Sequence, residues 1–128
     1  MNREELAWAA GFFDGEGTVC ARFPKPPRKV PQMVLRIRQA YSDKEWIDLG
    51  PYSEVLERFQ DAIGGLGILY GPYLVPDIRP QAAFEVNRFE HIQQVMCMLW
   101  PWLGTTKKDQ FTRTFRTYYE SFANLTGT

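Results

Sequence analysis

The segment Leu6 to Gly17, which reads LAWAAGFFDGEG, constrains the fold of this chain more than any other part. Ala7, Gly11 and Gly15 recur every four residues, so a helix would carry them along one face with almost no side chain. Small residues at this spacing allow the backbones of two helices to approach closely. The segment therefore predicts a helix that packs tightly against a second helix.

Two acids stand at the end of this small-residue face. Asp14 and Glu16 are each followed by a glycine, and a second helix of the same kind would bring its own pair of acids to the same place. Carboxylates that converge at a close contact repel each other unless a cation lies between them, and carboxylate oxygens are ligands that suit Mg²⁺. We therefore expect a shared, metal-dependent acidic site.

Length and composition narrow the class of protein. The chain has 128 residues, which predicts a single domain over 1–128. No apolar run is long enough to span a membrane, and Glu4 and Glu5 do not fit a signal peptide. Two cysteines, Cys20 and Cys97, are too few for a disulfide framework, which favours an intracellular, reducing compartment. The single histidine, His91, excludes a histidine-clustered metal site and argues against Ser/His/Asp catalysis.

The charges are unevenly distributed, although the formal net charge is zero. Residues 22–38 contain six basic side chains and no acid: Arg22, Lys25, Arg28, Lys29, Arg36 and Arg38. A second basic cluster holds Lys107, Lys108, Arg113 and Arg116. One basic face on a neutral protein is compatible with binding to nucleic-acid phosphates. An ordinary solvated surface is the alternative.

Hydrophobic periodicity predicts an alternation of helices with pairs of strands. We expect helices over 3–14, 52–63, 88–100 and 108–122, and strands over 18–23, 33–41, 68–73 and 82–87. This order, α-β-β-α-β-β-α-α, predicts an α+β fold with one antiparallel sheet backed by helices. Strand alternation puts Arg22, Arg36 and Arg38 on one exposed face, which we expect to be positive only. The aromatic stripe of the last helix is expected in the core: Phe111, Phe115, Tyr118, Tyr119 and Phe122.

The segment Ala9 to Gly17, AAGFFDGEG, resembles the LAGLIDADG motif of homing endonucleases in its Gly-Phe-x-Asp-Gly-Glu-Gly form. Ala9 stands where the motif has its leading Leu. The expected element order also matches that family, so the resemblance covers nearly the whole chain. It implies a four-stranded antiparallel saddle sheet, backed by helices, that lies in the major groove of double-stranded DNA. A two-stranded ribbon is narrow enough to reach base edges there.

The resemblance also implies roles for individual site residues. Glu16 would ligate Mg²⁺, with the Gly17 carbonyl as a further ligand and Mn²⁺ as an expected substitute. Lys107 corresponds to a basic residue near the active site, and Lys108 is one position away in the alignment. A polar residue at the end of the second strand would be catalytic, and Gln39 or Tyr41 could fill this position; we expect Gln39.

Further roles concern DNA and the second subunit. Arg22, Arg36 and Arg38 are the expected readers of bases or phosphates. Additional DNA-binding candidates are Lys25, Arg28, Lys29, Gln32, Tyr70, Arg79, Gln81 and Lys108. A single motif resembles homodimeric members of the family, with a dimer interface at Ala7, Ala10, Gly11, Asp14 and Gly15. The expected target is roughly palindromic and on the order of 20 base pairs long.

The sequence thus predicts a homing endonuclease that makes a double-strand break by Mg²⁺-dependent phosphodiester hydrolysis. The alternative is an RNA-binding intron maturase, a splicing cofactor on the same scaffold. A DNA-binding regulator without nuclease activity is a third possibility, which the presence of Glu16 opposes. No membrane partner and no small-molecule substrate are expected.

Overall fold

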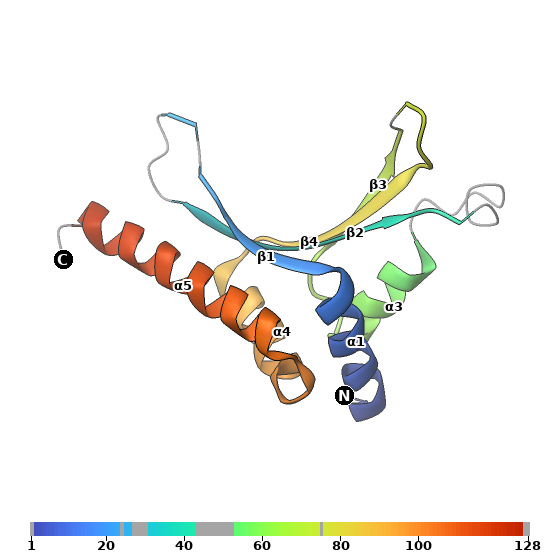
Figure 1. Ribbon diagram of the computed structural model, residues 1–128, viewed down its shortest axis with the longest axis horizontal. Coiled ribbons are helices and arrows are strands. Elements are labelled where there is room, and N and C mark those ends of the chain that lie inside the picture. The colour runs from blue at the N-terminus through green and yellow to red at the C-terminus, as the bar shows by residue number, and fades with distance from the viewer. Residues whose placement is uncertain (1, 24, 27–30, 43–52, 75, 127–128) are drawn as a thin grey trace.

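The computed structural model describes residues 2–23, 25–26, 31–42, 53–74 and 76–126. In this part of the chain, one sheet has helices on one side only (Figure 1). The four strands are β1 (Gly17–Arg22), β2 (Gln32–Ala40), β3 (Ile68–Tyr73) and β4 (Gln81–Val86). All pairs are antiparallel, and the order across the sheet is β1-β2-β4-β3. The α+β architecture predicted from the sequence is confirmed.

The first helix, α1 (Arg3–Glu16), begins and ends as its sequence dictates. The side chain of Asn2 accepts a hydrogen bond from the N–H of Glu5 at 3.1 Å and so caps the helix. The helix runs to Glu16, two residues beyond the predicted end at Asp14. It stops at Gly17, where a side chain would collide with the ring of Phe13. Glycine at this position lets α1 pass directly into β1.

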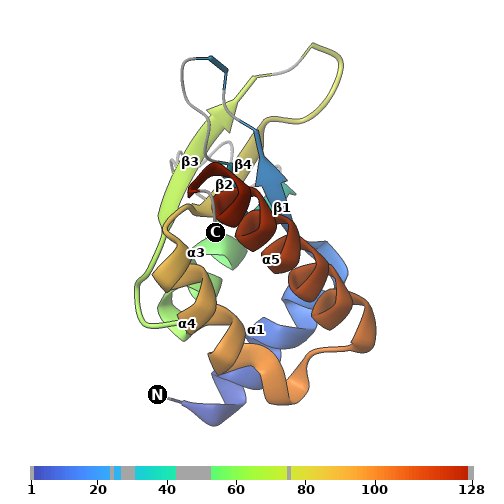
Figure 2. The same cartoon turned by 90° about the vertical axis from the view of Figure 1, so that its left-hand side faces the viewer.

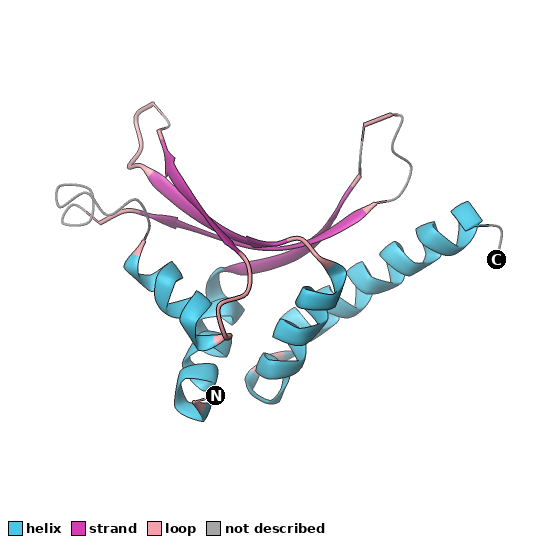
Figure 3. Cartoon of the chain, turned by 180° about the vertical axis from the view of Figure 1, so that it is seen from behind, coloured by secondary structure: helices cyan, strands magenta, loops and turns pink. Residues whose placement is uncertain are grey.

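The remaining helices lie with α1 beneath the sheet (Figures 1 and 3). They are α3 (Glu54–Ala62), α4 (Phe89–Leu99), a short 3₁₀ helix η1 (Trp100–Trp102) and α5 (Thr105–Thr126). The predicted start of α3 at Tyr52 lies outside the described residues. α5 begins three residues before the predicted start at Lys108, so both lysines of this region belong to its first turns. No helix in the described ranges is long and apolar enough to cross a membrane.

A cluster of aromatic rings joins α1, α3 and the sheet. The Phe59 ring lies 5.4 Å from Phe84 of β4 and 6.3 Å from Phe13 of α1, measured between centroids. All three side chains are fully buried. Burial of aromatic side chains of this size makes a large hydrophobic contribution to stability, so this cluster is the centre of the core.

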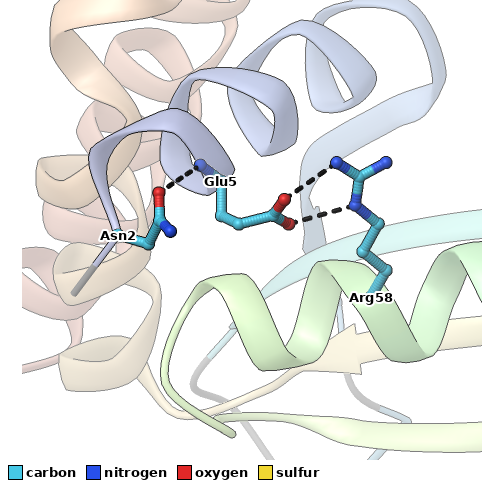
Figure 4. A network of polar contacts seen from close by, with 3 residues as sticks. All are labelled: Asn2, Glu5 and Arg58. Carbon is cyan, nitrogen blue, oxygen red and sulfur yellow. Dashed lines mark hydrogen bonds and ion pairs between the residues drawn. The ribbon is translucent and has the colours of Figure 1, made fainter.

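A polar contact on the surface joins the same two helices (Figure 4). Arg58 of α3 donates two hydrogen bonds to the Glu5 carboxylate, from Nε at 3.0 Å and from Nη2 at 2.9 Å. The guanidinium also lies 3.8 Å from the centre of the Trp8 ring. This hydrogen bonding stabilises both charged forms, so it lowers the pKa of Glu5 and raises the pKa of Arg58. This contact fixes the surface side of the α1–α3 packing.

The outer edge of β1 is covered by α5, which crosses this strand (Figure 2). Gln110 Oε1 accepts a hydrogen bond from the N–H of Val19 at 2.9 Å, and Thr114 Oγ1 donates one to the Val19 carbonyl at 3.2 Å. An edge strand otherwise exposes these backbone groups. The two side chains therefore satisfy both backbone groups of Val19.

The aromatic stripe of α5 is only partly covered. Phe89 of α4 stacks on Phe115 and Tyr118, with centroid distances of 5.6 and 5.0 Å. Tyr119 and Phe122 are 62% and 46% exposed, so the prediction that they lie in the core is wrong. The reason is that α5 continues past the first residue of α4, which leaves its last turns without a covering helix (Figure 1).

Candidate nucleic-acid interface and acidic site

The face of the sheet opposite the helices, called here the open face, gathers the residues that the sequence assigned to DNA. Strand register and alternation place six of these on it: Arg22, Gln32, Arg36, Arg38, Tyr70 and Gln81. Gln32 and Arg38 are exposed, and Tyr70 is half-buried. The predicted grouping of the three arginines on one face is therefore observed. Arg79 lies just before β4, and Lys25 is exposed after β1, whereas Arg28 and Lys29 lie outside the described residues.

The open face is not purely positive, which corrects one expectation. Glu85 of β4 lies opposite Arg36 of β2 in the strand register. Its Oε2 atom is 3.4 Å from Nε of Arg36 and 3.6 Å from Nη2 of Arg22. Glu85 has the same strand parity as Gln81, a predicted DNA-binding residue, but the sequence did not indicate that Glu85 lies beside Arg36 and Arg22, because the pairing of β4 with β2 joins strands far apart in the chain.

The motif acid contacts one of the predicted catalytic residues. Gln39 Nε2 donates a hydrogen bond to Glu16 Oε2 at 3.2 Å and another to the carbonyl of Arg38 at 2.9 Å. Glu16 is exposed at the junction of α1 and β1, and Gly17 pairs with Ile37 of β2. Tyr41, the other candidate for the strand-end position, is buried in the core. Of the two, Gln39 is the one that touches Glu16.

Asp14 ties α1 to the start of α5. Both of its carboxylate oxygens accept from the N–H of Gly104, at 3.1 and 3.0 Å. Gly104 directly precedes α5, whose first turns carry the two lysines. The sequence assigned Asp14 to the dimer interface but gave no sign of this partner within the same chain, which lies 90 residues away.

The two lysines lie in different surroundings. Lys108 Nζ is 5.3 Å from the centre of the Trp100 ring, at the contact between α5 and η1. Lys107 precedes Gln110 by one helical turn and Thr114 by two, so it shares the α5 face that contacts β1. β1 begins immediately after Glu16, which makes Lys107 the better placed of the two toward the acidic end of α1.

The donor atoms at this end of α1 fit a hard divalent cation. Glu16 is a carboxylate at a helix C-terminus, where the helix dipole favours positive charge, and the last turn contains no basic residue. Within the described residues, no group of three or more His, Cys, Asp or Glu side chains could hold a metal. A cation at Glu16 would thus take its other oxygen ligands from backbone carbonyls, such as that of Gly17, from water, from a substrate or from a second chain.

The small-residue face of α1 lies partly open. A Cβ atom added to Gly11 or Gly15 would meet nothing within 4 Å, so no contact within this chain requires glycine at either position. Ala7 is half-buried. Ala10, which was expected at the dimer interface, is fully buried in this chain's own core. That expectation is wrong, because its methyl group is not available to a second chain.

Solved structures provide the comparison with known proteins, since no protein-family model and no curated protein matches the chain. The LAGLIDADG homing endonuclease I-GzeII, solved with its DNA target, superposes with a TM-score of 0.67 at 16% identity, over 93% of this chain and 36% of that one. The LAGLIDADG meganuclease I-AabMI, bound to uncleaved DNA, gives 0.64 at 18% identity, over 100% and 39%. The homing endonuclease I-CvuI, in complex with its target in the presence of Ca²⁺, gives 0.60 at 20% identity, over 83% and 60%.

The chain spans 36–60% of the length of these three structures. At 16–20% identity, the similarity concerns the architecture, and it includes both the sheet and the helices beneath it. The chain therefore has the fold of the LAGLIDADG homing endonucleases, the family that its motif resembles.

Proposed function

We propose that this chain is one subunit of a homodimeric homing endonuclease that cuts both strands of a specific, roughly palindromic DNA site. The contact between Glu16 and Gln39 carries this proposal. It holds the motif acid beside β2, the strand that presents Arg36 and Arg38 on the open face. The proposed recognition residues on β2 and the acid at the end of α1 therefore lie on elements that touch each other, which suits hydrolysis of a bound duplex.

Each group of residues at the site has its own role in the proposed reaction. The arginines of the open face bind DNA, since guanidinium forks pair with guanine edges and with phosphates. Gln39 holds one oxygen of Glu16 by a hydrogen bond. Lys107 supplies positive charge for the phosphoryl oxygens, which become more negative in the transition state. Mg²⁺ bound at Glu16 and the Gly17 carbonyl, with Mn²⁺ as a substitute, would lower the pKa of a water and stabilise the leaving oxygen.

The dimer rests on α1. Gly11 and Gly15 present bare backbone at the surface, and a second copy related by a twofold axis would place its own α1 against them. Two copies would bring their Glu16 carboxylates together, and each copy would read one half of the target. Asp14 belongs to this region, but its carboxylate is held by Gly104 of its own chain.

The test selects DNA and then asks whether it is cut. Duplexes that bind the protein are selected from a randomised pool in Ca²⁺, and the recovered site is then incubated with protein in Mg²⁺. We expect double-strand cleavage of a near-palindromic site. Glu16→Gln should abolish cleavage and change the binding free energy by no more than about 1–2 kcal/mol, because Glu16 supplies metal binding more than recognition.

Other outcomes contradict specific parts of the proposal. Cleavage by Glu16→Gln at the wild-type rate would mean that Glu16 is not the metal ligand. A specific duplex that is bound but never cut would indicate a DNA-binding regulator. Failure to enrich any duplex, together with tight binding to structured intron RNA, would indicate the maturase.

A further inference from the structure

Two ion pairs, which join Glu85 to Arg22 and to Arg36, lie in the middle of the open face, where we propose that DNA binds. Glu85 is on β4, Arg36 is opposite it on β2, and Arg22 reaches it from β1. One carboxylate oxygen, Oε2, makes both contacts. An acid in this position opposes the approach of phosphate, so its presence on a DNA-binding surface needs a physical explanation.

The burial of the three side chains differs. The Glu85 side chain is 10% exposed, whereas those of Arg36 and Arg22 are 35% and 49% exposed. A buried carboxylate without a compensating charge is costly, so the two guanidiniums are held beside it. The acid therefore lies beneath the arginines, and the arginines form the outer surface.

The contacts neutralise charge without satisfying the arginine donors. Both distances, 3.4 and 3.6 Å, are long for hydrogen bonds between charged groups. Nε of Arg36 is buried and has no hydrogen-bond partner among the described residues. The arginines are thus held in place electrostatically, and at least one donor is left without an acceptor.

Such an arrangement distinguishes between two kinds of DNA acceptor. A phosphate is anionic and is repelled by Glu85, whereas the O6 and N7 atoms of guanine are neutral acceptors that a guanidinium pairs with directly. Building on the function proposed above, we propose that Glu85 is a specificity-determining residue. It directs Arg22 and Arg36 toward base edges and weakens their sequence-independent binding to phosphates.

The test replaces Glu85 by its neutral isostere, Glu85→Gln. Anisotropy titrations compare the selected site with a scrambled duplex of the same length and composition, over a range of salt concentrations. We expect the affinity for the scrambled duplex to rise about 3–10-fold and the salt slope to steepen by about one, because the arginines gain phosphate contacts. The affinity for the selected site should rise less, so that the ratio of the two affinities falls.

A control with the same charge change separates position from net charge. Glu57 is exposed on α3, which lies beneath the sheet, so Glu57→Gln alters the total charge equally but leaves the open face intact. We expect it to leave the affinity ratio unchanged. An equal fall of the affinity ratio in both variants, or an unchanged ratio in Glu85→Gln, would overturn the role of Glu85.

Two further measurements keep the result interpretable. If thermal melting shows that Glu85→Gln does not fold, Glu85→Asp replaces it in the test, since it retains the charge but draws it back by one methylene. This variant should lower the ratio of the two affinities by a smaller factor. No change in that ratio would overturn the role of Glu85. A wild-type protein that binds all duplexes equally would contradict the proposed function itself. A discriminating wild type with an unchanged Glu85→Gln ratio would contradict the role of Glu85 alone.

Discussion

The two faces of the sheet carry different chemistry on the same strands. On the face toward the helices, Leu35, Ile37 and Phe84 are fully buried against the core. On the open face, their neighbours are charged: Arg36 and Arg38 reach the surface, and Glu85 lies beneath Arg36. Because successive side chains of a strand point to opposite faces, stability and the proposed DNA recognition can be changed separately. A substitution should therefore affect one of these two properties, according to the face on which it lies.

The largest expected effect on stability is on the packed face. Phe84→Ala should lower the free energy of unfolding by about 3–5 kcal/mol, because it removes a buried ring that contacts Phe59 and leaves a cavity. The matched variant, Ile68→Ala, changes a residue of the neighbouring strand that faces the open side and is 53% exposed, and it should cost about 1 kcal/mol or less. Urea unfolding measures both. Equal losses of unfolding free energy would mean that the open face contributes to stability as much as the packed face does.

A smaller effect should distinguish the two lysines at the start of α5. Lys107→Met should reduce the rate of DNA cleavage about 10²-fold, because it removes positive charge from the face of α5 that contacts β1. Lys108→Met should leave the cleavage rate nearly unchanged, since its ammonium group lies over Trp100. Single-turnover cleavage of the selected site compares the two variants. The reverse order of rates would assign the active-site role to Lys108.

The smallest effect concerns the exposed contact between Glu5 and Arg58. The folded state lowers the pKa of Glu5 from 4.5 through the hydrogen bond from Arg58. The contact therefore contributes stability above the unfolded value of 4.5, and this contribution is lost as the pH falls through the lower folded value. Unfolding of wild type and Glu5→Gln should differ at pH 7, and the difference should shrink as the pH falls below 4.5 and through the folded pKa of Glu5. A difference that grows on acidification would have the wrong sign for this mechanism.

Much of the fold was predictable because its signals are local. Strand alternation around Arg36 and Glu85, the glycine after α1 and the apolar stripes of the helices all lie within short segments. The predicted boundaries differ from those observed by a few residues: α1 continues through Gly15 to Glu16, and α5 begins at Thr105 instead of Lys108.

The parts of the site that the sequence did not predict depend on contacts between distant segments. Glu85 meets Arg36 only through the pairing of β2 with β4, and Asp14 meets Gly104 only once the helices pack. Gln110 and Thr114, four residues apart on the helix that carries the aromatic stripe, were the available signal for a polar contact, but nothing local identifies Val19 as their partner. Periodicity identifies faces, and tertiary packing decides which faces meet.

The treatment of the sheet edges has a consequence for self-association. At one edge, both backbone groups of Val19 are already bonded to α5. At the other edge, β3 contains Pro72, which has no N–H, within a register irregularity between Tyr70 and Tyr73. Both outer strands are thus poor templates for strand addition by another chain. The protein can keep one face of the sheet uncovered without offering another chain an edge for strand pairing, which is the hazard that an unpaired edge strand otherwise carries.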